Sequence, residues 1–286
     1  MVGRRKPEWL KTQLPQGKLY MQVNEIVRAH RLHTICTDGL CPNRSECWSR
    51  GTATFMIGGD VCTRSCKFCH VKTGRPYPLD PKEPENIARS VKLLQLRHAV
   101  ITSVDRDDLP DLGAAHWVRV IQAVRAANPN ITMETLIPDF QGKAALIGLV
   151  LEARPEVVSH NLETVRRLSK DVRSRATYET SLAVIRQIAA HGVAAKSGIM
   201  LGLGETREEV IETLDDLRSA GCSVVTIGQY LQPSAKNVAV AEYVPPEVFE
   251  EYRRIGKEKG FAHVESAPLV RSSYHAEKHR SAENNL

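Results

Sequence analysis

Three cysteines in the first third of the chain have a spacing that is typical of an iron–sulfur site. Cys62, Cys66 and Cys69 lie in the sequence CTRSCKFC and follow the pattern C-x-x-x-C-x-x-C. Structural zinc sites usually take four ligands from paired cysteines, whereas this segment supplies three thiols. A cubane cluster held by three thiolates keeps one iron without a protein ligand, and that iron is able to bind a small chelating molecule and pass it an electron. The spacing therefore predicts a reactive centre; a zinc knuckle or three separate buried thiols is the alternative.

A second group of three cysteines comes just before the first. Cys36, Cys41 and Cys47 lie in the sequence CTDGLCPNRSECW, in which a glycine and a proline favour loop structure. Two neighbouring triplets, each one ligand short of a closed cubane, favour a second cluster over a coincidence of spacing. A zinc site that borrows a histidine such as His33 is the alternative for this group.

The composition bounds the fold and the compartment. The chain has 286 residues, 42% of them hydrophobic, which is enough for one α/β domain of barrel size. The chain has seven cysteines, an odd number, and six of them lie between Cys36 and Cys69. This argues for a reducing compartment and against a secreted disulfide framework. The basic N-terminus is followed by no apolar run of signal-peptide or membrane-spanning length, so we expect a cytoplasmic protein with no membrane partner.

The charge balance narrows the classes of partner. The formal net charge of +6 is compatible with an acidic protein partner or with solubility alone. Aromatic residues make up 5% of the chain, and no basic run is interleaved with them, so we expect no nucleic-acid partner.

The elements that must position the cysteines follow an alternating pattern. Short apolar runs alternate with amphipathic helical patterns, which predicts six βα units in an α/β fold, a partial (β/α)6 TIM-type barrel with its chemistry at the carboxyl ends of the strands. Strands are expected at residues 52–57, 99–104, 131–137, 157–161, 195–200 and 224–230. Helices are expected at residues 83–96, 114–127, 143–153, 178–191, 207–220 and 245–259.

We expect three parts that form one compact unit. Residues 1–50 make an N-terminal extension with the second cysteine group, residues 51–235 make the partial barrel, and residues 236–286 make a C-terminal extension. The family resemblance described below implies that the two extensions together carry an auxiliary iron–sulfur cluster.

The central triplet resembles the signature of radical S-adenosylmethionine enzymes, including the aromatic Phe68 before the last cysteine. In that family the open iron binds the amino and carboxylate groups of S-adenosylmethionine, and reductive cleavage gives a 5'-deoxyadenosyl radical. Asn161 and Glu163 at a predicted strand end suit the ribose hydroxyls, and Arg175 or Lys196 suits the carboxylate. The residues predicted to bind this cofactor are Phe68, Thr102, Ser103, Asn161, Glu163, Arg175 and Lys196.

A narrower resemblance, to the lipoyl synthase family, runs over nearly the whole chain. It is carried by the sequences KPEWLK, CTDGLCPNRSECW, CTRSCKFC, TSVDRDDLPD, SHNLETV, SGIMLGLGET, GQYLQPS and RSSYHA. The sequence CTDGLCPNRSECW together with the C-terminal RSSY is the most specific combination, because a lone C-x-x-x-C-x-x-C indicates only the superfamily.

The resemblance implies a set of cofactors and ligands. There would be two [4Fe-4S] clusters, with Cys62, Cys66 and Cys69 on the one that cleaves S-adenosylmethionine and Cys36, Cys41 and Cys47 on an auxiliary one. The second serine of RSSY, Ser273, would be the fourth auxiliary ligand, and the resemblance places it with Arg271 among the catalytic residues. From sequence alone, a Ser-Ser pair in a loop reads as a hydrogen-bonding turn element.

The resemblance also implies a reaction and its partners. The family is a group of sulfurtransferases that insert sulfur at C6 and C8 of a protein-bound octanoyl-lysine, with the sulfur supplied by the auxiliary cluster. The expected partners are octanoylated lipoyl carrier domains or H protein, a ferredoxin or flavodoxin as electron donor, and iron–sulfur carrier proteins. A radical sulfur inserter with another substrate, or an iron–sulfur or zinc protein without enzymatic activity, is the alternative.

Overall fold

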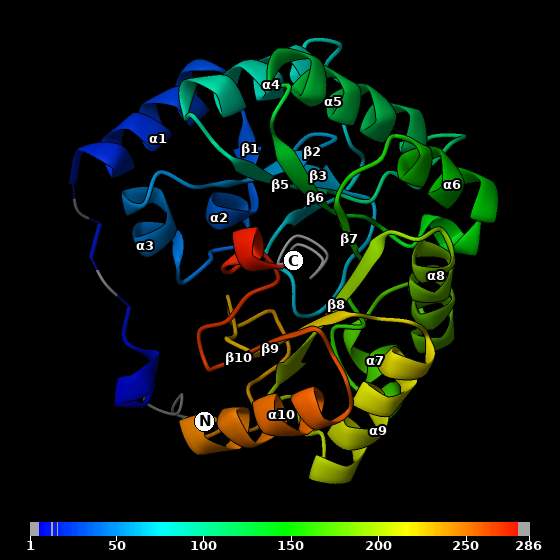
Figure 1. The fold of residues 1–286 in the computed structure, drawn as a ribbon. Helices are drawn as coiled ribbons and strands as arrows, with labels where there is room; N and C mark the ends of the chain where they lie inside the picture. Colours follow the sequence, from blue (N-terminus) through cyan, green and yellow to red (C-terminus); the bar gives the residue numbers. More distant parts are fainter. Residues whose placement is uncertain (1–5, 13, 16, 280–286) are drawn as a thin grey trace, which may run out of the picture.

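The chain folds around a curved sheet whose connections run through helices on the outside (Figure 1). The structure, a computed structural model, describes residues 6–12, 14, 15 and 17–279, so the two ends of the predicted extensions lie outside the described residues. The main sheet has the strand order β1-β2-β5-β6-β7-β8-β9-β10, with β1 antiparallel to β2 and the other neighbours parallel. These strands are β1 His33–Thr34, β2 Thr54–Ile57, β5 His98–Ser103, β6 Thr132–Leu136, β7 Val157–Ser159, β8 Ala194–Leu201, β9 Val224–Gln229 and β10 His263–Ser266.

The sheet is an open barrel, because β1 and β10 stand at the two ends of the strand order. The six predicted strands are confirmed as β2 and β5 to β9, and the predicted α/β partial barrel is therefore confirmed as the fold class. A parallel barrel of this kind brings the carboxyl ends of its strands to one rim, which is where ligand sites form.

The helices that connect the strands ring the outside of the barrel in Figure 1. The six predicted helices are confirmed as α4 Glu83–Leu93, α5 Ala114–Ala127, α6 Ala144–Glu152, α8 Tyr178–Ala190, α9 Arg207–Ser219 and α10 Pro246–Glu258. The remaining helices are α1 Gly17–Ala29, α2 Ile35–Asp38, α3 Arg44–Ser49 and α7 Arg166–Val172, with 3-10 turns at Glu8–Leu10, Phe140–Gly142 and Ala276–Lys278. Within the described ranges, no helix combines the length and the apolar character needed to cross a membrane.

Local sequence explains where α9 begins and ends. The Thr206 side chain accepts a hydrogen bond from the backbone N–H of Glu209, and the Glu209 side chain accepts one from the backbone N–H of Thr206. This capping box satisfies two N–H groups that the helix itself leaves unpaired. Gly221 follows the last turn with a φ of 84°, which glycine adopts without the steric penalty that a Cβ atom brings.

Several short elements were missed by the sequence-based prediction. The strand β10 adds a seventh parallel strand, and its alternation of partly buried and buried residues is too short to stand out in the sequence HVES. The helix α7 has few apolar residues, RRLSKDV. The second cysteine group was expected as a loop, yet Cys36 lies in α2 and Cys47 in α3, with Cys41 between them.

The apolar core lies between the outer helices and the sheet. The helix α5 buries one face, and the strands β2 and β5 present the complementary apolar side chains. The largest of these fully buried side chains are Trp117 and Ile121 on α5, Phe55 and Ile57 on β2, and Ile101 on β5. Each such side chain contributes about 1.5–3 kcal/mol when it leaves water, which makes the barrel wall a firm support for the loops at its rim.

The C-terminal segment, residues 267–279, lies against the barrel (Figure 1, red). The backbone N–H of Ala267 donates to the carbonyl of Ile227 at 3.2 Å, and that of Gln229 donates to the carbonyl of Pro268 at 3.1 Å. A Cβ atom at Gly228 would lie 2.1 Å from the carbonyl oxygen of Val270. The segment therefore reaches β9 only because position 228 has no side chain.

Replacing Gly228 with alanine should destabilise the protein by about 1–3 kcal/mol, because the new methyl group forces the C-terminal backbone away from β9. Urea unfolding monitored by circular dichroism measures the change. Gly148→Ala is the matched control, since nothing lies within 4 Å of a Cβ at that position in α6. Its stability should be unchanged or raised by up to about 1 kcal/mol. Equal stability of the two variants would contradict the close packing at β9.

Candidate active site

The central cysteine loop leaves the barrel after β2 and is held at both ends. Cys62 ends the short strand β3 (Val61–Cys62), which pairs in parallel with β4 (Lys72–Thr73). Between these strands, the Asn237 side chain donates to the carbonyl of Cys69 at 2.9 Å. Phe68 packs against a small buried apolar cluster that contains Val172, Leu203 and Tyr230. The loop is thus fixed by both polar and apolar contacts.

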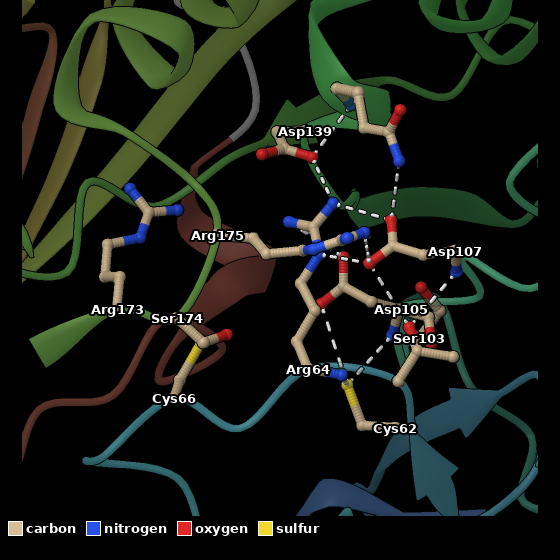
Figure 2. Close-up of polar contacts among 12 residues, drawn as sticks. Cys62, Arg64, Cys66, Ser103, Asp105, Asp107, Asp139, Arg173, Ser174 and Arg175 are labelled. Atoms are coloured by element: carbon tan, nitrogen blue, oxygen red, sulfur yellow. Dashed lines mark hydrogen bonds and ion pairs between the residues drawn. The ribbon is translucent and has the colours of Figure 1, made fainter. Parts of the chain in front are cut away.

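Arg64, inside the same loop, is bound by the carboxylates of the neighbouring strand ends (Figure 2). Its guanidinium donates to both carboxylate oxygens of Asp107, at 2.8 and 2.9 Å, and to Asp139 at 2.8 Å. A further oxygen, on Asp105, lies 3.3 Å away. The Arg64 side chain is 4% exposed, so these charged groups meet in a site from which water is largely excluded. The hydrogen bond from Arg64, more than any other contact, lowers the pKa of Asp107 to about 2.

The thiols of this loop lie in a setting that suits metal-bound sulfur. The backbone N–H groups of Asp105 and Arg64 donate to the Cys62 sulfur at 3.3 and 3.4 Å. Burial, followed by the neighbouring Asp105 carboxylate, raises the pKa of Cys62 to about 12. Burial also raises the pKa of Cys69 to about 11, with the Cys66 thiol as a further contribution. A cation that replaces the protons would relieve this repulsion.

The second cysteine group has the same character. Burial, with repulsion between the neighbouring thiolates as a second cause, raises the pKa of Cys36 to about 11 and that of Cys47 to about 12. The buried indole N–H of Trp48 has no nitrogen or oxygen partner among the described residues, and its contact with Cys36 favours the thiolate. Burial also raises the pKa of Cys41, and the Arg271 guanidinium opposes this.

Both triplets open onto one cavity of about 1400 Å³ at the barrel rim. A ring nitrogen of His70, just after Cys69, donates to the carbonyl of Asp38 at 3.1 Å and so links the two cysteine segments. The predicted residues that line the cavity are Cys36, Cys41, Cys47, Cys62, Cys66, Cys69, Phe68, Thr102, Ser103, Asn161, Glu163, Arg271 and Ser273.

The C-terminal segment brings its serines to the same cavity. The Asn43 side chain donates to the carbonyl of Leu269 at 2.6 Å, and the Tyr274 hydroxyl donates to Glu46 at 3.1 Å. Ser272 accepts a hydrogen bond from the Asn161 side chain at 2.8 Å. Within the part of the chain that the structure describes, the Ser273 hydroxyl forms no hydrogen bond and faces the cavity without a partner.

Asn161 and Glu163 follow β7 and form a polar corner of the cavity. The Oδ1 atom of Asn161 is buried and has no hydrogen-bond partner among the described residues. A Cβ atom at Gly198 would lie 3.1 Å from that oxygen and 2.5 Å from the Thr226 hydroxyl, so glycine keeps this corner open. Glu163 has a φ of 69°, a conformation that is strained for a residue with a side chain. Burial raises its pKa, and Arg173 opposes this.

Arg173 is a cavity residue that the sequence-based prediction missed. Its guanidinium donates to Ser181 at 2.7 Å, and Ser181 in turn donates to the Nε2 atom of His160 at 2.9 Å. The Nδ1 atom of His160 donates to the carbonyl of Ile137 at 2.9 Å. Burial lowers the pKa of His160 to about 4, so this ring is neutral at neutral pH and fixes the hydroxyl that holds the arginine. Arg173 itself is 9% exposed.

Two predicted cofactor residues lie outside the set that lines the cavity. Lys196 is the third residue of β8, far from its carboxyl end, and its fully buried ammonium donates to Glu134 at 2.7 and 2.8 Å. Arg175 lies 3.4 Å from Asp107, with its side chain 62% exposed. Arg173, two residues before Arg175, does line the cavity.

Thr102 and Ser103 line the cavity, but their hydroxyls already form hydrogen bonds within the barrel. Thr102 donates to the carbonyl of Leu136 at 3.3 Å, and Ser103 accepts from the indole of Trp117 at 3.3 Å. Both hydroxyls therefore join neighbouring elements at the rim.

The donor sets fit an iron–sulfur cluster better than a single ion. Among the described residues, no three His, Cys, Asp or Glu side chains are gathered closely enough to hold one metal ion. In a cubane, by contrast, each thiolate meets a different iron at a separate corner. Each segment supplies three thiols, of which Cys36 is buried and the other five are partly buried, and backbone N–H groups donate to the Cys62 sulfur; this matches the ligand chemistry of such a cluster.

Comparison with known proteins identifies the class first. Residues 56–217 match the model of the radical SAM superfamily. Methylornithine synthase has a TM-score of 0.55 at 12% identity, covering 95% of this chain and 84% of that one. Streptococcus suis SuiB bound to S-adenosylmethionine has a TM-score of 0.56 at 11% identity, covering 84% of this chain and 53% of that one. At these identities the structures show the fold alone. The fold and the superfamily match define a radical S-adenosylmethionine enzyme.

Closer relatives give the family. Residues 3–41 match the model described as the N-terminal domain of lipoyl synthase. The lipoyl synthase of Treponema denticola is 65% identical, covering 97% of this chain and 96% of the relative. That of Parabacteroides distasonis is 63% identical, covering 96% of this chain and 98% of the relative. The chain belongs to the lipoyl synthase family.

Replacing Arg64 with methionine should lower the free energy of unfolding by about 3–5 kcal/mol, because it leaves the Asp107 and Asp139 carboxylates without their buried cation. Urea unfolding of the iron-free protein measures the shift. Arg175→Met is the matched control, since it removes a mostly exposed ion pair to the same Asp107 and should change stability by at most about 1 kcal/mol. Similar losses in both variants would show that burial of Arg64 is not what matters.

Proposed function

We propose that this chain inserts sulfur at C6 and C8 of an octanoyl chain that is amide-linked to a lysine of a lipoyl carrier domain. The observation that carries the proposal is the single cavity that all six clustered cysteines, Ser273 and the polar corner at Asn161 share. A site for hydrogen abstraction and a site for sulfur donation must lie close together, because a carbon radical has to meet the sulfur before it reacts elsewhere. One cavity lined by both triplets meets that requirement.

The proposed cofactors are two [4Fe-4S] clusters and S-adenosylmethionine. Cys62, Cys66 and Cys69 would hold one cluster, and the auxiliary cluster would be held by Cys36, Cys41, Cys47 and Ser273. When bound, these groups supply the electron, the 5'-deoxyadenosyl radical and the sulfur, so the hard chemistry belongs to them. A serine oxygen is a harder and more easily displaced ligand of iron than a thiolate, which suits a cluster that gives up its sulfur.

The protein residues position and shield the reactants. Asn161 and Glu163 would bind the ribose hydroxyls, since a buried amide oxygen without a partner is ready to accept a hydrogen bond. Arg173 would meet the carboxylate of S-adenosylmethionine, because it is the buried cation that the Ser181 hydroxyl and the Leu162 carbonyl hold at the cavity. Arg64 keeps the cysteine loop against the strand ends, and Arg271 offsets negative charge at Cys41.

The partners follow from the reaction. The protein substrate is proposed to be an octanoylated lipoyl carrier domain or H protein. A ferredoxin or flavodoxin would supply electrons, and iron–sulfur carrier proteins would rebuild the auxiliary cluster.

An anaerobic assay with an octanoyl-lysine peptide, S-adenosylmethionine and a reductant tests the function. Mass spectrometry should find a lipoyl peptide that carries two sulfur atoms, and limiting S-adenosylmethionine should leave a product with one. The same assay without the peptide is the control for uncoupled cleavage. Release of 5'-deoxyadenosine without any sulfur in the octanoyl chain would remove this function and leave only the superfamily.

Replacing Ser273 with alanine tests the auxiliary ligand. The iron content should fall from about eight to about four per chain as one of the two clusters is lost, while 5'-deoxyadenosine release is largely retained. Iron and sulfide analysis after anaerobic purification measures the loss. Ser272→Ala is the matched control, because it removes the neighbouring hydroxyl that bonds Asn161 and should keep the iron content of the wild type. Full iron content in Ser273→Ala would count against serine ligation.

A further inference from the structure

A buried group of charged residues inside the barrel is not used by the proposed reaction. Glu134 on β6 and Lys196 on β8 have fully buried side chains, and the Lys196 ammonium donates to both carboxylate oxygens, at 2.7 and 2.8 Å. Ser159 donates to the same carboxylate at 2.8 Å. Burying such a pair is expensive unless every donor finds an acceptor.

The third donor of the ammonium is satisfied by the C-terminal segment. Lys196 donates to the Nδ1 atom of His279 at 3.1 Å, and the His279 side chain is fully buried. Because Nδ1 accepts, a neutral His279 ring carries its proton on Nε2. This atom is buried without a hydrogen-bond partner among the described residues and lies 4.0 Å from the Glu265 carboxylate. Burial, more than any other cause, lowers the pKa of His279 and so favours this neutral form. The three N–H groups of Lys196 therefore meet three acceptors.

This contact fixes the segment that carries Ser273. Ser273 lies six residues before His279, and its hydroxyl has no partner of its own among the described residues. Its place at the cavity is therefore set by what holds the chain on either side. Before Ser273, the backbone of residues 267 and 268 is bonded to β9, and Leu269 and Ser272 accept from Asn43 and Asn161. After Ser273, the Tyr274 hydroxyl donates to Glu46, and the fully buried contact is at His279.

We propose that Glu134, Lys196 and His279 form an internal anchor that positions Ser273 at the auxiliary site. Glu134 lines the same cavity, but no hydrogen bond or ion pair among the described residues joins these three side chains to the six clustered cysteines. They are therefore positioning residues that act through the backbone between His279 and Ser273. This inference rests on the proposed role of Ser273. Removing the His279 ring leaves one N–H of the Lys196 ammonium buried without an acceptor, and the segment loses its fully buried hydrogen bond to the barrel.

The ion pair of Glu277 differs from this anchor because it is exposed to solvent. Glu277 lies in the same segment, but its carboxylate meets Arg50 at 3.4 Å with both side chains about half exposed, at 44% and 49%. Solvent-exposed ion pairs of this kind contribute little. The contacts of His279 and Glu277, one buried and one exposed, lie two residues apart on the same segment and thus offer a matched comparison.

The experiment compares His279→Leu, His279→Asn and Glu277→Gln in the full-length protein purified without oxygen. Hydrogen–deuterium exchange of residues 270–278 reports the segment directly, and iron and sulfide analysis reports the auxiliary site. In His279→Leu we expect exchange at least about tenfold faster, and iron falling from about eight towards about four per chain. His279→Asn places an acceptor near the position of Nδ1 and should restore both values towards those of the wild type, and Glu277→Gln should change neither.

The outcomes separate the anchor from its alternatives. Wild-type exchange and full iron in His279→Leu would overturn the proposal, and so would an equal effect of Glu277→Gln. Faster exchange with full iron would overturn the positioning of Ser273, because the segment would then be loosened without consequence for the cluster. If the wild type itself holds about four irons and makes no lipoyl product, the proposed function fails, whereas the exchange comparison still decides whether the anchor holds the segment.

Discussion

The buried ion pairs of Arg64 are the interaction on which the central site depends. A loop that carries three thiols and few apolar residues has little hydrophobic contact with which to hold a shape. Arg64 supplies the missing constraint, because Asp107 and Asp139 bind it from two different strand ends and fix its direction. A charged group buried in this way is costly to misplace, so the loop has one arrangement that satisfies all its partners. The position of the cysteines relative to the barrel follows from that arrangement.

Much of the fold could be predicted because apolar periodicity reports burial directly. The six predicted strands and six predicted helices have patterns long enough to show which face is covered, and the structure has them within a few residues of the expected bounds. The elements that were missed have no such pattern. β10 has four residues, two of them charged or titratable, and it becomes a strand because β9 offers a free edge beside it. Edge pairing of this kind is a tertiary effect that local sequence does not encode.

The site could be predicted only in part, for a related reason. Cysteine spacing and strand ends are local features, and the predicted thiols and strand-end residues do line one cavity. Cations are harder to place, because Arg173 and Arg175 stand two residues apart and only the fold decides which is buried. Lys196 is different, since it is the third residue of a strand of eight and lies far from the carboxyl end. Its position along the strand already argued against the rim.

The hydrogen bond between Asn43 and the carbonyl of Leu269 joins two positions that are 226 residues apart in the chain. Contacts of such long sequence separation form late, because the intervening chain must be ordered before the loop between them can close. During synthesis the strands β2 to β9, which end at Gln229, leave the ribosome well before Val270 and the residues that follow it. The side of the cavity between Asn43 and Leu269 is therefore formed after most of the barrel. A polypeptide that ends before Leu269 would keep the barrel strands, but its cavity would be open to solvent on that side.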